Sequence, residues 1–127
     1  MKPKIDLIKY IGHPYESYDC LKLVQEFYKD HYDVTVKNYF EGDVPDRREV
    51  NSLIVSNKGD FARVDKPQFG DIVVISLYGL ECHIGVCTSK GLFLHSVRGA
   101  GSLQDKLSRY EKMITGFYRL RDANDPT

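Results

Sequence analysis

Residues 71–77 (DIVVISL) form an almost unbroken apolar run, and this run constrains the fold of the chain more than any other stretch. Strands that are covered on both faces have this composition, so we expect a central strand of a sheet here. Further strands are predicted at residues 82–88, 92–97 and 115–120, where glycine-containing turns separate short apolar stretches. Short strands with such turns indicate an antiparallel sheet.

The first half of the chain predicts helices. Apolar residues recur at helical spacing from Asp19 to His31, and either Ser17 or Asp19 can cap the start of that helix. Other expectations are one or two helical turns at 5–11, a short strand or extended loop at 33–40, a helix at 46–56 and a connector at 57–67. Helices followed by strands predict an α+β fold, and the length suits a single domain over residues 1–127.

The charge of the chain excludes several classes of partner. The 18 Lys and Arg residues balance the 18 Asp and Glu residues, so no broad electrostatic attraction to nucleic acid or to an anionic membrane is expected. The sequence has no apolar run of membrane-spanning length, and its first residues lack the apolar core of a signal peptide. We therefore expect no nucleic acid, no membrane and no export by a signal of its own.

The chain has three cysteines, Cys20, Cys82 and Cys87, so at least one thiol is free in a monomer. Cys20 lies at the predicted start of a helix, where unpaired N–H groups and the helix dipole lower the pKa of a thiol. Taken alone, Cys20 fits better the role of a small buried apolar residue. Cys82 and Cys87 lack the CxxC spacing of zinc or redox sites.

Two histidines, His83 and His95, lie in neighbouring predicted strands. A hairpin centred on Ser89 would place them directly opposite each other on one face. Strand alternation puts Gly85 on the same face as His83, which would leave open space for a helix end or a substrate backbone. A two-residue loop would instead shift the register by one and separate the rings.

Two facing histidines allow three interpretations. They can be a metal-binding pair with Cys20 or Cys87 as a third ligand. They can be polar residues on an exposed face without a function. In the third interpretation His83 is a general base and His95 orients it.

Four short motifs occur in a familiar order: Asp19-Cys20 before an apolar helix, Gly70-Asp71-Ile72-Val73, His83-Ile84-Gly85-Val86 and Phe93-Leu94-His95-Ser96. This order, from about Gly12 to Leu120, resembles the NlpC family of papain-like cysteine peptidases. The resemblance implies an α+β papain-like fold in which N-terminal helices, including the nucleophile helix, pack on an antiparallel β-sheet.

The same resemblance assigns roles to residues. Cys20 is the implied nucleophile, His83 the base and His95 the third polar residue. Tyr15 corresponds to a family tyrosine near the oxyanion site, and Tyr18 competes with it for that role. No metal or cofactor is implied.

The implied reaction is hydrolysis of an amide in bacterial peptidoglycan stem peptides, usually the bond between γ-D-glutamate and the next diamino acid. The shortened lead-in at 13–18 resembles members of the family found in bacteriophage tails. This implies phage tail proteins as partners, and the virion or the host cytoplasm as location.

One departure from the family keeps two other functions open. Family members carry Ser-Gly after the nucleophile, where this chain has Leu21-Lys22. The chain can therefore be a structural tail-tip or tail-assembly component with a vestigial groove. It can also be an acyltransferase or an amidase on another substrate, because one fold hosts several acyl-transfer reactions.

Overall fold

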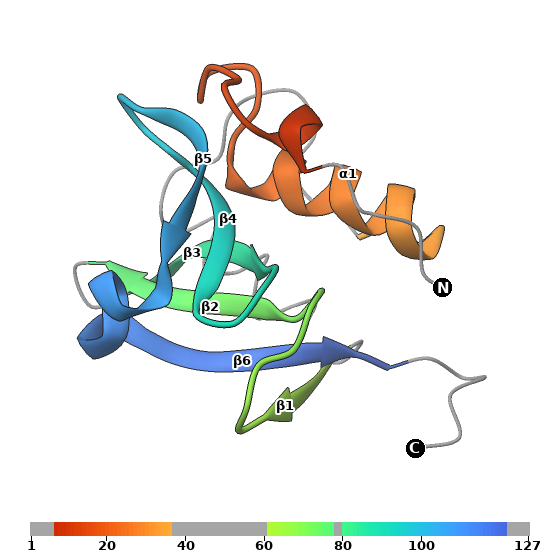
Figure 1. Ribbon diagram of the computed structural model, residues 1–127, viewed down its shortest axis with the longest axis vertical. Coiled ribbons are helices and arrows are strands. Elements are labelled where there is room, and N and C mark those ends of the chain that lie inside the picture. Colours follow the sequence, from red (N-terminus) through yellow and green to blue (C-terminus); the bar gives the residue numbers. More distant parts are fainter. Residues whose placement is uncertain (1–6, 37–60, 78–79, 122–127) are drawn as a thin grey trace.

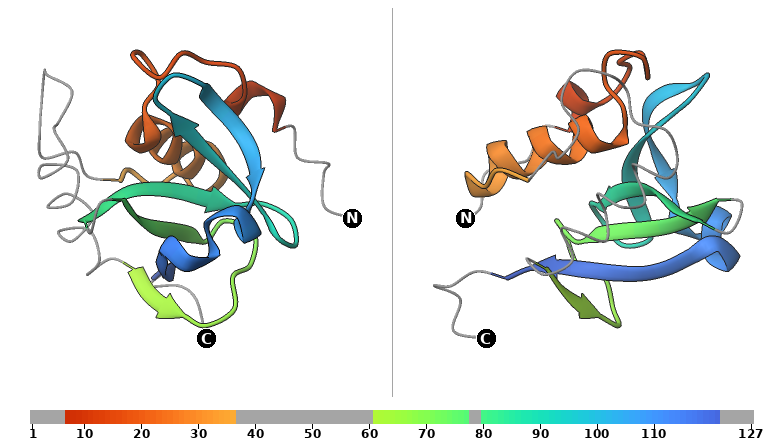
Figure 2. Two further views of the ribbon diagram at one scale, coloured as in Figure 1. Left: turned by 90° about the vertical axis from the view of Figure 1, so that its left-hand side faces the viewer. Right: turned by 180° about the vertical axis from the view of Figure 1, so that it is seen from behind.

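The computed structural model describes residues 7–36, 61–77 and 80–121. Its elements are η1 (Ile8–Tyr10), α1 (Cys20–Tyr32), β1 (Phe61–Val64), β2 (Ile72–Leu77), β3 (Leu80–Cys87), β4 (Leu92–Val97), β5 (Gly101–Lys106), η3 (Leu107–Met113) and β6 (Ile114–Leu120). The strands form one antiparallel sheet in the order β1-β6-β2-β3-β4-β5. Helix α1 lies against one side of this sheet (Figures 1 and 2), which confirms the predicted α+β fold.

Helix α1 begins where the sequence predicts it, and Asp19 rather than Ser17 is its cap. The Asp19 side chain accepts a hydrogen bond of 2.9 Å from the backbone N–H of Lys22. The helix ends at Asp33, whose φ of 53° is left-handed and stops the helical hydrogen-bond pattern. The helix therefore has a defined start, and its first residue is Cys20.

Strand β2 separates two apolar clusters. Ile72 and Val74 face the cluster that contains the apolar side of α1. Val73 and Ile75 face the second cluster, together with Phe93. Burial on both faces is the property that the apolar run at 71–77 predicts, and the central position of β2 in the sheet confirms it.

Two strands differ from the prediction. The predicted connector at 57–67 contains β1, which pairs with β6 from Phe61 opposite Leu120 to Val64 opposite Phe117. The polar stretch Gly101–Lys106 was not predicted as a strand, yet it pairs along its whole length with β4. Both are edge strands, and pairing with a neighbouring strand, rather than their own composition, makes them strands; the partner is distant in sequence for β1 and the preceding strand for β5. The predicted helix at 46–56 and the end of the stretch at 33–40 lie outside the described residues.

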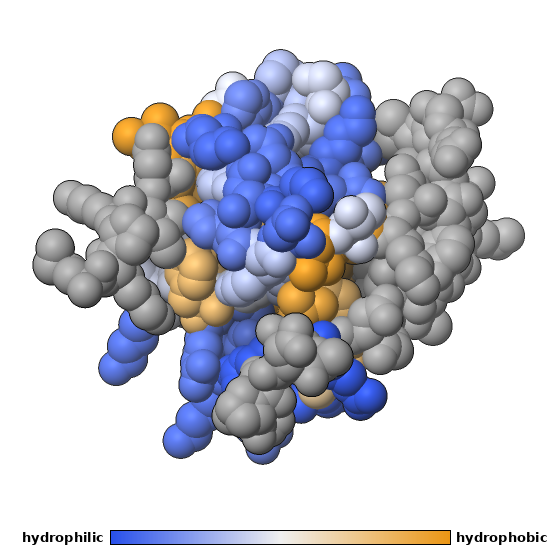
Figure 3. Space-filling model, turned by 90° about the vertical axis from the view of Figure 1, so that its right-hand side faces the viewer, coloured by the Kyte–Doolittle hydropathy of each residue, from blue (hydrophilic) through white to orange (hydrophobic). Residues whose placement is uncertain are grey.

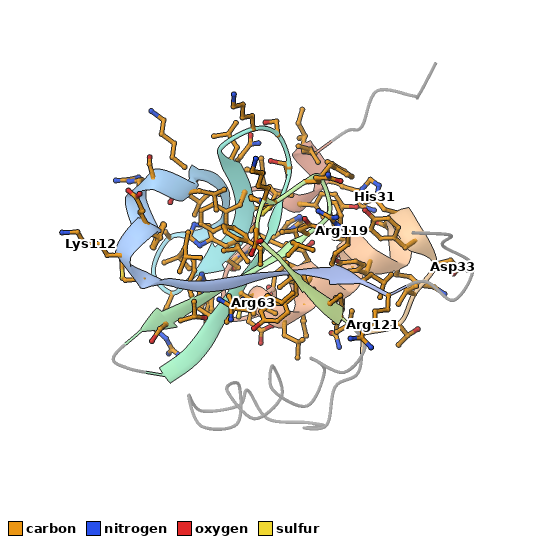
Figure 4. The ribbon with its side chains drawn as sticks, turned by 90° about the horizontal axis from the view of Figure 1, so that it is seen from below. His31, Asp33, Arg63, Lys112, Arg119 and Arg121 are labelled. Carbon is orange, nitrogen blue, oxygen red and sulfur yellow. The ribbon has the colours of Figure 1, made fainter. Side chains whose placement is uncertain are left out.

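An ion pair ties the sheet together on its lower side. The guanidinium of Arg119, on β6, donates hydrogen bonds of 2.9 Å and 2.8 Å to the two carboxylate oxygens of the buried Asp71. Figure 4, a view from below, labels Arg119 on β6 and Arg63 on the paired strand β1. A two-pronged contact of this kind fixes the start of β2 against β6.

In the view of Figure 3, the apolar residues among those that the structure describes form small separate patches beside hydrophilic ones. Within the described residues, no helix has the length and apolar character needed to cross a membrane.

Candidate active site

Cys20 is the first residue of α1, and its side chain is buried. The helix start is attached to the sheet just ahead of it, because the Ser96 hydroxyl donates a hydrogen bond of 2.5 Å to the backbone oxygen of Tyr18. Ser96 follows His95 in β4. The loop before α1 is also bonded to β5, through hydrogen bonds between His13 and Ser102. These contacts bring the candidate nucleophile to the strand that carries a candidate histidine.

His83 and His95 are in direct contact, as predicted. Nε2 of His83 lies 2.8 Å from Nδ1 of His95, and both rings are buried. Burial, together with the neighbouring His95, lowers the pKa of His83 to about 3. Burial also lowers the pKa of His95. Both imidazoles are therefore neutral near pH 7, and a neutral imidazole is the form that accepts a proton.

The hairpin has a different register from the predicted one. Val86 pairs with Leu94 and Cys87 with Phe93, so the hairpin is centred on residue 90 rather than on Ser89. A shift of one residue in the centre moves the pairing by two residues, which leaves both histidines on the same face because side chains alternate with a period of two. The two rings meet as diagonal rather than directly opposed neighbours.

The predicted open space beside Gly85 is wrong. A Cβ atom at Gly85 would lie 2.6 Å from the backbone oxygen of Leu94 and 2.7 Å from the Phe93 ring. Strand β4 therefore fills this space, and neither a helix end nor a substrate can enter it. The glycine has a different effect, since it lets β3 and β4 approach closely at the level of the two histidines.

Asp105 is a member of the site that sequence reasoning missed. Its Oδ2 lies 3.2 Å from Nε2 of His95, and its side chain is 8% exposed. Oδ1 accepts hydrogen bonds from the backbone N–H of Lys106 at 2.8 Å and from Arg109 at 3.3 Å. Burial by itself would raise the pKa of this carboxyl, but the donors around it outweigh burial and hold its pKa below the ordinary value. Asp105 is thus a buried carboxylate that ends a chain of two histidines.

The two candidate tyrosines lie in different surroundings. Burial raises the pKa of Tyr15, the negative charge of a Cys20 thiolate adds to this, and the nearby Arg98 opposes it. The Arg98 guanidinium lies 5.1 Å from the centre of the Tyr15 ring. Tyr15 is therefore close enough to Cys20 to respond to its charge.

Tyr18 is oriented differently. Its pKa is raised by burial and then by Glu26, without a contribution from Cys20. Its hydroxyl is fully buried and has no hydrogen-bond partner among the described residues. Of the two predicted oxyanion residues, Tyr15 is the one that the electrostatics connect with Cys20.

The remaining residues of interest lie away from this cluster. Leu21 is buried among the apolar residues of the core, and Lys22 is exposed. Cys87 lies in the second apolar cluster, where burial and then the charge of Asp71 raise its pKa to about 12. The side chain of Cys82 lies outside the described part of the structure. Among the described residues, no group of three or more His, Cys, Asp or Glu side chains is arranged to hold a metal ion.

No model of a known protein family matches the chain, and no curated protein does. A solved structure does match, the crystal structure of the NlpC/p60 domain of the peptidoglycan hydrolase SagA. The similarity has a TM-score of 0.59 at 15% sequence identity, and it covers 90% of this chain and 92% of that one. The fold of this chain is therefore the papain-like α+β fold of an NlpC/p60 domain.

Proposed function

We propose that this protein is a cysteine peptidase that hydrolyses an amide bond in peptidoglycan stem peptides. The observation that carries the proposal is the buried series of hydrogen bonds from Asp105 to His95 and from His95 to His83. His95 lies on β4, the strand whose Ser96 is hydrogen-bonded to the residues just before Cys20. A thiol at a helix start, a neutral imidazole and a group that orients the imidazole are the parts of a cysteine hydrolase. The similarity to a domain of a peptidoglycan hydrolase supports the substrate class.

The first half of the reaction forms a covalent intermediate. His83 takes the proton of the Cys20 thiol, and the thiolate attacks the amide carbonyl carbon. The carbonyl oxygen becomes an oxyanion, which the Cys20 backbone N–H and the Tyr15 hydroxyl stabilise by hydrogen bonds. The tetrahedral intermediate then collapses, the C–N bond breaks, and the protonated His83 gives its proton to the leaving amine. The product of this half is a thioester on Cys20.

The second half releases the acid. His83, neutral again, accepts a proton from water while the water oxygen attacks the thioester carbonyl carbon. Collapse of this second tetrahedral intermediate breaks the C–S bond, and His83 returns the proton to the Cys20 sulfur. One water is consumed, and one carboxylic acid and one amine are formed. Apart from the substrate and this water, the steps use only side chains of this chain and the backbone N–H of Cys20.

The finer parts of the proposal concern the bond and the setting. The resemblance to the NlpC family favours the bond between γ-D-glutamate and the following diamino acid. The short lead-in before Cys20 favours a tail protein of a bacteriophage, whose virion would deliver the enzyme to the wall.

The Leu21-Lys22 pair does not favour the alternative of a vestigial groove. Leu21 contributes to the core that holds α1 on the sheet, and Lys22 points into solvent while its backbone N–H completes the helix cap. Neither side chain belongs to the hydrogen-bonded chain of candidate residues. The departure from the family pattern is thus accommodated by packing on the helix itself.

The test is digestion of purified stem peptides, read by mass spectrometry. The unmodified protein should release two fragments, and Cys20→Ala should release none while unfolding at the same temperature within a few degrees. Cys87→Ala is the matched control, because it removes the other described buried thiol without touching the candidate site. It should lower stability by about 1–2 kcal/mol and retain cleavage.

Two outcomes would contradict the proposal. Cleavage that survives Cys20→Ala would remove Cys20 from the mechanism. Failure to cut stem peptides from several wall types, in a protein that tail assembly still requires, would favour the structural alternative.

A further inference from the structure

We propose that Asp105 is a positioning residue that decides, through His95, which nitrogen of His83 carries a proton. Its kinetic consequence rests on the proposed peptidase function, whereas its spectroscopic consequence does not. The carboxylate lies on β5, directly opposite Phe93 of β4, and so approaches His95 from the neighbouring strand. Sequence motifs around the candidate triad do not include this residue.

The direction of each hydrogen bond follows from the carboxylate of Asp105, which ends the series. An ionised carboxylate can only accept, so Nε2 of His95 must carry the proton that points at Oδ2 of Asp105. A neutral His95 then has a lone pair on Nδ1. The contact of 2.8 Å from that nitrogen requires Nε2 of His83 to be the donor. The remaining nitrogen of His83, Nδ1, is left without a proton and is the free base.

The carboxylate is itself held by groups that can only donate. The backbone N–H of Lys106 and the guanidinium of Arg109 both point at Oδ1. Oδ2 faces His95 and the Tyr110 hydroxyl, which lies 3.4 Å away. Because both groups at Oδ1 can only donate, only an acceptor fits at the Oδ1 position. A change from carboxylate to amide therefore fixes the orientation of the amide, with its oxygen at Oδ1 and its NH₂ group at Oδ2.

Replacement of Asp105 by Asn should reverse the direction of both hydrogen bonds, the one to His95 and the one between His95 and His83. The amide oxygen must take the Oδ1 position, because an NH₂ group there would face the two donors. The NH₂ group then occupies the Oδ2 position and donates to Nε2 of His95. His95 must carry its proton on Nδ1 and donate it to Nε2 of His83, and His83 is left protonated on Nδ1. The nitrogen that should accept the Cys20 proton is then blocked.

The experiment is measurement of the imidazole ¹⁵N shifts near pH 7.5, together with stem-peptide kinetics. In the unmodified protein we expect protons on Nε2 of both histidines. In Asp105→Asn we expect them on Nδ1 of both, with kcat lower by about 10⁴-fold, the loss that a wrong tautomer causes in a Ser–His–Asp protease, and KM changed by only a few-fold. Asp105→Ala imposes no tautomer, so its kcat should exceed that of Asp105→Asn.

Two control variants isolate the effect. Arg109→Gln leaves the carboxylate in place, and Asp30→Asn makes the same chemical change at a residue that is hydrogen-bonded to Lys9 and Tyr10. Both should keep the original tautomers. Unchanged tautomers in Asp105→Asn, or kcat within a few-fold of the unmodified protein, would overturn the proposal. If Asp105→Asn does not fold, a proton on Nδ1 of His83 in the unmodified protein would overturn it instead.

The two failures can be told apart. A protein that cuts no stem peptide but shows reversed tautomers in Asp105→Asn would contradict the proposed function and leave the role of Asp105 standing. A protein that cuts stem peptides but shows the same tautomers in both forms would contradict only the role of Asp105.

Discussion

At the scale of single residues, two tyrosines five and two positions before the candidate nucleophile have opposite surroundings. Tyr15 responds to the charge of Cys20, whereas the hydroxyl of Tyr18 is buried in the neighbourhood of Glu26. Sequence spacing alone leaves both as oxyanion donors. Their electrostatic neighbours separate them, because only a hydroxyl near the thiolate can stabilise charge that develops there.

Tyr15→Phe should therefore lower kcat by about 10²-fold, the loss typical of one oxyanion donor, with little change in stability. Tyr18→Phe should keep kcat and should leave stability unchanged or slightly higher, because it removes a buried hydroxyl that has no described partner. Stem-peptide kinetics and thermal unfolding of both variants decide between them. Equal kcat losses would mean that neither hydroxyl is specific to the oxyanion.

At the scale of elements, the start of α1 is attached to two strands by two different serines. The Ser96 hydroxyl donates to the Tyr18 carbonyl, two residues before Cys20. The Ser102 hydroxyl accepts from the His13 N–H, earlier in the same loop. Both serines are buried, but the partner of Ser96 is buried and close in sequence to the candidate nucleophile, whereas the partner of Ser102 is exposed and farther from it.

The two serines make a matched pair of variants. Ser96→Ala should cost about 1–2 kcal/mol of unfolding free energy, because it leaves the backbone oxygen of the buried Tyr18 without its Ser96 partner. Ser102→Ala should cost less, because His13 is exposed and water can replace the lost partner of its N–H. Only Ser96→Ala should also lower kcat strongly, by up to about 10²-fold, since a shift of about 1 Å at the nucleophile is enough for such a loss. Urea unfolding and peptide kinetics give both quantities. A larger kcat loss in Ser102→Ala would show that the loop, not the helix start, positions the site.

At the scale of the whole molecule, the buried histidines make stability depend on pH. His83 has a pKa of about 3 when folded and about 6.5 when unfolded, so below pH 6.5 the unfolded state binds the proton. The stability that neutral His83 contributes is complete above pH 6.5 and is lost as pH falls toward 3. The lowered pKa values of His95 and Asp105 act in the same direction, that of Asp105 only in stronger acid.

Acid should therefore destabilise the protein before most of its carboxylates titrate. Each pH unit below 6.5 removes about 1.4 kcal/mol for His83, so a change from pH 7.5 to 4.5 should cost about 2–3 kcal/mol in urea unfolding. His83→Gln has no group to protonate there and should show a visibly smaller loss over the same interval. A stability that is flat between pH 7.5 and 4.5 would mean that the histidines are solvated rather than buried.

Local patterns determined the parts of this fold that depend on neighbours in sequence. The apolar run at 71–77 predicts a strand buried on both faces, and helical spacing after Asp19 places Cys20 at a helix start; both are confirmed. The contact between His83 and His95 is confirmed as well, because the observed pairing differs from the expected one by two residues and so leaves both side chains on the same face. The catalytic roles of these residues stay predictions.

Tertiary structure alone decided the register and the third partner. The centre of the hairpin depends on the geometry of the turn. The sequence predicts a centre at Ser89, and the structure has it at residue 90. Asp105 lies in a polar stretch whose composition does not indicate a strand, and only its pairing with β4 brings Asp105 to His95. β1 likewise exists through its pairing with β6. Hydrogen bonds to a partner strand, and the burial that accompanies them, are properties of the assembled sheet and not of any segment within it.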